Sequence, residues 1–238
     1  MPESTEAWRE RTAYRSYLHF AMVMLEFMKM GKWSADQLRS KMEILEIDDF
    51  TDAQRQEKGV VIVSGHFGNW EVAIGYLHLL DVRSAVIQQR QKNVLVNERM
   101  KALREKWGME IIYPRGAVKE SIKALHEGKA VALLGDQDAG DRGVFVPFFG
   151  RMSSTHVGAA LMALKTGAPV ILGICTRTAS NYFRLEFQTI SASGLPENLH
   201  SAVVELTARH TRMLEAAIRK NPEQYFWMHR RWKTPPKD

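Results

Sequence analysis

A histidine and a glutamate within residues 60–71, VVIVSGHFGNWE, suggest catalysis by their types and spacing. A histidine that is hydrogen-bonded to a carboxylate can act as a general base, because the carboxylate fixes the imidazole tautomer and stabilises its cation. His66 and Glu71 are five residues apart, which corresponds to about 140° on one continuous helix. They can therefore meet only if His66 precedes the helix and its ring folds back over the first turn, a path that flanking glycines permit.

The chemistry that such a pair would suit is removal of a proton from a hydroxyl. Ser64 is close in sequence but lacks the GxSxG pattern of a nucleophile elbow, so a hydroxyl of the substrate is the favoured nucleophile. The alternative is structural. His66 would then be a hydrogen-bonded turn histidine, and Glu71 a first-turn carboxylate that complements the helix dipole.

The residues around this pair predict the end of a buried strand. Residues 60–63 are all apolar and β-branched, without polar alternation, which is typical of a strand covered on both faces. From Asn69, a good N-cap, apolar residues recur at helical spacing as far as Leu80. His66 is thus expected on the turn at the carboxyl end of a central strand, where open α/β sheets place ligands.

The rest of the chain alternates predicted strands and helices. Strands are expected at residues 85–87, 111–113, 130–134 and 169–175, with an antiparallel edge strand at 183–187, and helices at 5–30, 34–47, 93–107, 117–126, 157–165 and 197–220. This alternation predicts the α/β class, with a mostly parallel, mixed central sheet flanked by helices. We expect a single domain over residues 1–238, with a helical N-terminal part (1–58) and an α/β core (59–238).

Polar residues also follow the strand predicted at 130–134. Asp136, Gln137 and Asp138 come directly after it, so they could face the same cleft as His66. Paired aspartates can hold a divalent metal, but carboxylates that cap amides or pair with arginines are the favoured interpretation, and no metal is predicted. Residues 153–155, SST, are interpreted as caps of the helix that follows.

Composition limits the classes of function. The chain has 238 residues, 45% of them hydrophobic, and its single cysteine, Cys175, allows neither an internal disulfide nor a thiolate metal cluster. A net charge of +6 favours acidic partners. Residues 1–10 do not have the pattern of a signal peptide, and residues 17–30 are too few to span a bilayer. The helix at 5–30 is apolar nearly all round, so it lies in the core or against a membrane or partner.

The C-terminal tail, EQYFWMHRRWKTPPKD, interleaves aromatic and cationic residues. Such a mixture suits a membrane interface, where rings sit at headgroup depth and cations meet phosphates. The same residue types stack on nucleic acid, and a packed tail is the third interpretation.

Four separated segments together resemble one family. GHFGNWE, KNVLVNERMKALREKWG, DQDAGDRGVFVPFFG followed by SST, and PEQYFWMHRRWK occur in the order found in the bacterial lipid A biosynthesis acyltransferases, within the lysophospholipid acyltransferase group. The resemblance runs from about residue 2 to residue 236. The chain begins inside the family's N-terminal region, where members usually carry a membrane-spanning or membrane-docking segment.

The resemblance implies roles for particular residues. His66 matches the catalytic base, Glu71 its acidic partner, and Arg104 a cation that steadies an oxyanion or phosphate. The other positions implied to bind substrate are Gly68 and Asn69 in the turn, Asp136, Gln137 and Asp138 in the aspartate-rich segment, and the basic pair Arg230 and Arg231.

The implied reaction moves a fatty acyl chain from a thioester to a hydroxyl of a lipid A precursor or related glycolipid. The donor would be acyl carrier protein or coenzyme A, without another cofactor, and the oxyanion would meet Arg104 or the backbone N–H groups of residues 65–69. The expected location is the cytoplasmic face of the bacterial inner membrane, bound peripherally, with no nucleic-acid partner. The alternatives are a thioesterase or other lipid hydrolase that uses the same dyad, and a non-catalytic lipid- or nucleic-acid-binding module.

Overall fold

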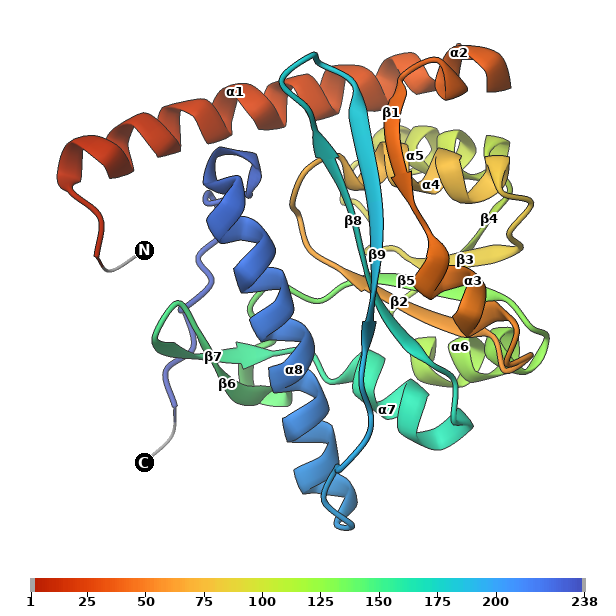
Figure 1. The fold of residues 1–238 in the computed structure, drawn as a ribbon, viewed down its shortest axis with the longest axis vertical. Coiled ribbons are helices and arrows are strands. Elements are labelled where there is room, and N and C mark those ends of the chain that lie inside the picture. Colours follow the sequence, from red (N-terminus) through yellow and green to blue (C-terminus); the bar gives the residue numbers. More distant parts are fainter. Residues whose placement is uncertain (1–2, 237–238) are drawn as a thin grey trace.

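The computed structural model describes residues 3–236 and is built on a seven-stranded sheet of order β1-β9-β8-β2-β5-β3-β4 (Figure 1). Five neighbouring strands are parallel: β8 (Val170–Arg177), β2 (Val60–Ser64), β5 (Ala130–Leu134), β3 (Ser84–Ile87) and β4 (Met109–Ile112). β9 (Phe183–Ile190) runs antiparallel to β8, and β1 (Met42–Glu46) runs parallel to β9. The α/β class and the mostly parallel, mixed sheet are confirmed.

Helices cover both faces of this sheet. α6 (Ala117–His126), α7 (Gly158–Thr166) and α8 (Leu199–Lys220) pack on one face, and α2 (Ala35–Arg39), α3 (Asp48–Gln54), α4 (Trp70–Leu79) and α5 (Val94–Lys106) belong to the other. The central strand β2 shows the consequence, since Val61 and Val63 enter one core while Val60 and Ile62 enter the other. The prediction that this strand is buried on both faces is confirmed.

The long helix α1 (Glu6–Met30) crosses one end of the molecule, at the top of Figure 1. It begins after the N-cap Thr5 and buries a single stripe, made of Thr12, Ser16, His19, Val23, Phe27 and Met30. Its opposite side exposes large apolar residues: Tyr14, Tyr17, Leu18, Met22, Leu25 and Met28. The helix is therefore only half core. None of the helices in the described part of the chain is both long enough and apolar enough to cross a membrane.

Two predictions for the N-terminal half of the sheet were wrong. The capping box at Ser34 and Gln37 is present, but α2 ends at Arg39, and the residues predicted to continue the helix form β1. β1 pairs with β9, so β9 lies inside the sheet rather than at its edge. The ladder of backbone hydrogen bonds that β9 offers outweighs the local preference of this stretch for helix, as tertiary context often does.

A separate hairpin carries the segment that follows the aspartates. β6 (Val144–Phe148) and β7 (Arg151–Thr155) are antiparallel, preceded by the 3-10 turn Gly140–Arg142. Ser153 and Ser154 therefore do not cap α7, and the prediction that they do was wrong. Ser153 instead donates to the Val146 carbonyl across the hairpin, at 3.1 Å. After α8, a second 3-10 turn (Pro222–Gln224) leads into the tail.

Candidate active site

The turn between β2 and α4 is shaped by two glycines. Gly68 has a φ of +63°, and a Cβ there would overlap the carbonyl oxygen of Cys175. At Gly65 a Cβ would lie 2.8 Å from Leu214 and 3.2 Å from the Asp136 carboxyl carbon. Because only glycine fits both places, the chain passes close to β5 and β8 and carries His66 to the carboxyl end of the sheet.

His66 is held by Asp136, the second residue after β5. The ring Nδ1 lies 2.9 Å from Asp136 Oδ1, and the backbone N–H of His66 donates to Asp136 Oδ2, also at 2.9 Å. One carboxylate thus fixes both the backbone and the ring of His66. The strands β2 and β5 are direct neighbours in the sheet, which is why residues 70 positions apart in sequence meet here.

The ionisation state of Asp136 determines which ring nitrogen of His66 carries the proton. Burial acts to raise the pKa of the Asp136 carboxyl, but the charge of His66 and the hydrogen bonds from its ring and backbone outweigh burial, so that the pKa lies below its ordinary value. The carboxylate is therefore ionised at neutral pH and can only accept. The proton of neutral His66 consequently sits on Nδ1, which leaves the lone pair on Nε2.

The His66 side chain is partly accessible, and Nε2 is the ring nitrogen that does not bond to Asp136. The side chain is 22% exposed, and its ring lies between two aromatic residues, with centroid distances of 5.1 Å to Trp70 and 5.9 Å to Phe226. The amide nitrogen of Gln137 is 3.5 Å from His66 Nε2. Phe20 of α1 packs on both aromatic residues, at 6.4 Å from Trp70 and 4.7 Å from Phe226. A hydroxyl could approach Nε2 in this aromatic-walled mouth.

Glu71 does not pair with His66, and the predicted hydrogen bond between them was wrong. Its carboxylate is buried and accepts two hydrogen bonds from Arg104, at 2.6 and 3.1 Å, and one from the indole of Trp70, at 3.1 Å. Glu71 lies in the first turn of α4, and a partner on the adjacent α5 satisfies it. Arg104 also donates to the side-chain oxygen of Gln88, at 2.6 Å. Its guanidinium is thus enclosed rather than free in the cleft.

Four of the five N–H groups expected to form an oxyanion hole, those of residues 66 to 69, are not available for it. The N–H groups of residues 66 to 69 all have partners: Asp136 for His66, Gly65 O for Phe67, Gln224 O for Gly68 and Cys175 O for Asn69. These bonds follow from the close packing of the turn against β8 and the tail. An oxyanion must therefore find its donor outside these four N–H groups.

Helix α1 holds the same turn from outside. His19 Nε2 donates to the Gly68 carbonyl at 3.0 Å, and Glu26 accepts a hydrogen bond of 2.7 Å from Asn69, whose Oδ1 caps α4. Ser16 donates to the Tyr225 carbonyl of the tail. These contacts were not predicted. The available signal was polar residues at helical spacing inside an otherwise apolar helix.

The remaining predicted site residues divide into buried and exposed. Asp138 binds the tail, because its carboxylate accepts from the Thr234 hydroxyl at 2.9 Å while its N–H donates to His229 at 2.8 Å. Arg231 is 2% exposed and donates to Ser154 and Thr155 of the hairpin. Arg230 is exposed. The structure therefore brings together His66, Asp136 and Gln137, while Asp138 and Arg231 fasten the tail.

An apolar cavity of about 80 Å³ lies behind Trp70, between α4 and the sheet. Its lining includes Ala73, Ile74 and Leu77 from the helix and Ala132 from the centre of β5. Arg104 is also part of the wall. Trp70 both lines this cavity and touches the His66 ring, so the cavity is one residue away from the candidate base.

The sequence also matches known proteins over nearly its whole length. Residues 1–234 match the model of a family described as bacterial lipid A biosynthesis acyltransferase. The chain is 26% identical over 242 residues to lipid A biosynthesis palmitoleoyltransferase of Escherichia coli, covering 99% of this chain and 76% of that protein. It is 26% identical over 244 residues to the lauroyltransferase of the same organism, with the same coverage. Phosphatidylinositol mannoside acyltransferase of Mycolicibacterium smegmatis is 25% identical over 157 residues, 64% of this chain and 52% of that protein.

Proposed function

The chain belongs to the bacterial lipid A biosynthesis acyltransferase family, and we propose that His66 is the general base of its O-acyl transfer to a lipid A precursor or related glycolipid. The observation that carries this proposal is the hydrogen bond from His66 Nδ1 to Asp136, because it leaves Nε2 as a proton acceptor at the carboxyl end of the sheet. Asp136 thereby takes the place that the sequence analysis gave to Glu71.

The proposed reaction needs one base and no covalent enzyme intermediate. His66 Nε2 removes the proton of the acceptor hydroxyl while the hydroxyl oxygen attacks the carbonyl carbon of the acyl thioester. The tetrahedral intermediate collapses, the C–S bond breaks, and the thiolate takes the proton from the imidazolium. The products are an ester and a free thiol. Asp136 stabilises the imidazolium that exists between the two proton transfers.

We assign stabilisation of the oxyanion to Gln137. Its amide nitrogen lies 3.5 Å from His66 Nε2, whereas the backbone N–H groups of residues 66–69 already have partners. A donor placed beside the base can reach the oxygen of a carbonyl that the deprotonated hydroxyl attacks. One such donor typically contributes about 10²–10³-fold to the rate.

Glu71 and Arg104 act, in this proposal, as positioning residues. Glu71 accepts the indole N–H of Trp70, whose ring lies against His66, and Arg104 neutralises Glu71. The pair thus fixes one wall of the mouth and one end of the apolar cavity behind Trp70. That cavity would receive the first methylenes of the donor's acyl chain, next to the thioester, because the carbonyl carbon would then lie beside the base.

The acyl donor is proposed to be carried by acyl carrier protein, with coenzyme A as the other possible thiol. A net charge of +6 favours a partner with acidic surface, and Arg230 lies exposed on the tail close to the site. Both thiols give the same chemistry at His66. No further cofactor is required by the proposed steps.

A membrane surface is the proposed location of the acceptor, on the cytoplasmic face of the bacterial inner membrane. The exposed side of α1 presents tyrosines, leucines and methionines, and exposed cations such as Arg11, Arg15 and Lys29 lie on the same helix. Apolar residues with flanking cations suit the interface of a bilayer that contains anionic lipids. Since Phe20 of the same helix lies over the His66 mouth, the acceptor would meet the base without leaving the interface.

The test is transfer followed by mass spectrometry. The full chain is incubated with mixed acyl thioesters and, in separate arms, a lipid A precursor or phosphatidylinositol mannoside. We expect one acyl chain to be added to the acceptor, and His66→Ala to lower the rate by about 10²–10⁴-fold. His126→Ala, at an exposed position on α6, is the matched control and should have no effect. Free fatty acid without acylated lipid would indicate a thioesterase and refute the proposal.

A further inference from the structure

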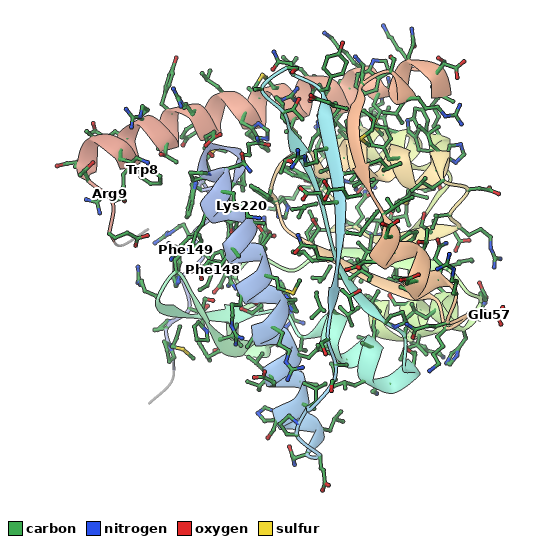
Figure 2. All side chains as sticks on the ribbon, viewed as in Figure 1. Trp8, Arg9, Glu57, Phe148, Phe149 and Lys220 are labelled. Atoms are coloured by element: carbon green, nitrogen blue, oxygen red, sulfur yellow. The ribbon has the colours of Figure 1, made fainter. Side chains whose placement is uncertain are left out.

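A second, larger cleft lies beside helix α1. It has a volume of about 380 Å³, within the usual range of small-molecule sites. Three segments that are distant in sequence form it: α1, the turn of the β6–β7 hairpin and the C-terminal tail. Its lining consists of Trp8, Arg9, Thr12, Ala13, Phe149, Arg151, Trp227 and Trp232. Figure 2 labels Trp8 and Arg9 at the N-terminal end of α1, with Phe149 across from them on the hairpin.

The floor of the cleft is aromatic. Phe149 packs against Trp227 with ring centroids 5.3 Å apart, and Trp232 stacks on Phe148 at 5.8 Å. The indole N–H of Trp232 is buried and has no hydrogen-bond partner within residues 3–236. An apolar ligand suits this surface.

The rim of the cleft is cationic. Arg9 and Arg151 are exposed, and neither guanidinium has an ion pair in the described part of the chain. Arg151 lies over the Trp232 ring at 5.2 Å. The carboxylates of Glu3 and Glu215 are engaged by Arg219. Two unpaired guanidinium groups beside an apolar floor fit an amphiphile with an anionic headgroup, and phosphate matches the fork of arginine donors.

The cleft is connected to the candidate base through one residue. Trp227 follows Phe226, whose ring packs on His66 and whose N–H donates to the His66 carbonyl at 2.9 Å. Along α1, Ala13 in the cleft and Phe20 at the mouth are about 10 Å apart. Each ring that contacts His66 is thus linked to one apolar site: Trp70 lines the cavity, and Phe226 precedes Trp227, which lines the cleft. A transferase that joins two lipidic substrates needs two such sites.

We propose that this cleft binds an acyl chain that the acceptor already carries, with Arg9 and Arg151 binding a phosphate of the same acceptor. The proposal rests on the acyl transfer proposed above, and it assigns the cavity behind Trp70 to the donor and the cleft to the acceptor. A phosphorylated, acylated glycolipid would then be selected by its existing chain and charge, at a distance from the hydroxyl that reacts.

Photolabelling locates the site without requiring turnover. The probe is phosphatidic acid with a diazirine in the middle of one acyl chain, added to the full chain in detergent micelles and mapped by mass spectrometry. We expect label on residues 8–13 and 227–232. Unlabelled lipid A precursor should compete better than phosphatidylglycerol at equal concentration, which distinguishes the acceptor from a bilayer lipid. Label confined to the cavity behind Trp70, or spread over the surface, would overturn the proposal.

Different variants test the binding of the acyl chain and the binding of the phosphate. Ala13→Trp fills the cleft and should abolish labelling there. Arg9→Gln combined with Arg151→Gln should raise the KM for a phosphorylated acceptor about tenfold or more, because charge-assisted hydrogen bonds are lost, and leave the KM for the dephosphorylated acceptor and for the donor unchanged. Arg115→Gln, an exposed arginine on the loop before α6, is the matched control.

An unchanged KM for the phosphorylated acceptor in the double variant would refute the assignment of the arginines. Failure of this inference is distinguishable from failure of the proposed function. If acyl transfer is observed but the cleft is never labelled, the function stands and the acceptor site is wrong. If the cleft is labelled but only free fatty acid is produced, the lipid site stands and the transferase proposal is wrong.

Discussion

Replacement of Asp136 by asparagine should abolish the base without unfolding the protein. In the native structure one carboxylate oxygen accepts the His66 backbone N–H and the other accepts Nδ1–H. Asparagine offers one acceptor and one donor in nearly the same shape. If its oxygen faces Nδ1, its NH₂ group opposes the backbone N–H, and two buried donors remain unsatisfied. That arrangement costs about 1–3 kcal/mol for each group.

The other orientation satisfies every group and is therefore favoured. The amide oxygen accepts the backbone N–H, and the amide NH₂ donates to His66 Nδ1. Nδ1 must then carry the lone pair, so the proton moves to Nε2, and Nε2 can no longer accept a proton from the substrate. The same reversal of tautomer in a catalytic triad lowers kcat by about 10⁴-fold. We expect a loss of about 10³–10⁴-fold in Asp136→Asn, with KM values nearly unchanged.

The assay is acyl transfer by the purified variant, followed by mass spectrometry of the acceptor, with circular dichroism and thermal unfolding as tests of the fold. Asp141→Asn, an exposed aspartate in the turn after β5, serves as the control of equal chemistry. A variant at Asp136 that keeps activity within about tenfold of wild type, with a native melting temperature, would contradict the assignment of Asp136 as the residue that orients His66.

Three further substitutions test other parts of the structure. Glu71→Gln leaves the buried charge of Arg104 unpaired and should lower the free energy of unfolding by about 3–5 kcal/mol, measured by urea titration. Unchanged stability would contradict the importance of this ion pair, and unchanged activity would contradict the positioning role of Glu71. Ala73→Leu reduces the cavity behind Trp70, so the variant should have a higher KM for the acyl donor, and an unchanged KM would place the donor chain elsewhere. Burial lowers the pKa of His210 from 6.5 to about 4, so on acidification the unfolded chain binds this proton before the folded chain does. The free energy of unfolding should therefore be highest above pH 6.5 and fall by about 3 kcal/mol as the pH drops to 4. His210→Leu should remove most of this pH dependence in denaturation curves measured between pH 6.5 and 4.

The sequence predicted local features well because they depend on neighbouring residues. Asn69 caps α4 as expected, since an N-cap needs only the amide N–H three residues ahead. The strand at residues 60–64 and the turn that places His66 at its carboxyl end follow from β-branched residues and glycines in one short segment. These signals survive in any tertiary context that buries the strand.

Pairings between distant segments could not be predicted in the same way. The sequence analysis placed Asp136 beside the cleft but gave the role of acidic partner to Glu71, which is nearer in the chain. The acidic partner of His66 is set by the order of the strands. β5 adjoins β2, so Asp136, two positions after β5, reaches His66. The first turn of α4, which carries Glu71, instead faces α5 and Arg104. Sequence separation carries no information on that order. The contacts of His19 and Glu26 were missed for the same reason.

The dual role of α1 follows from its two sides. Its buried stripe donates to the Gly68 carbonyl through His19 and binds Asn69 through Glu26, so the position of the catalytic turn depends on how this helix is seated. Its outer side is apolar and exposed, with Leu25 53% accessible to solvent. A surface that binds the outer side would therefore restrain the turn that carries His66, since both are attached to one rigid helix. Contact of the outer side of α1 with a lipid interface, as proposed above, would therefore be physically linked to the geometry at His66.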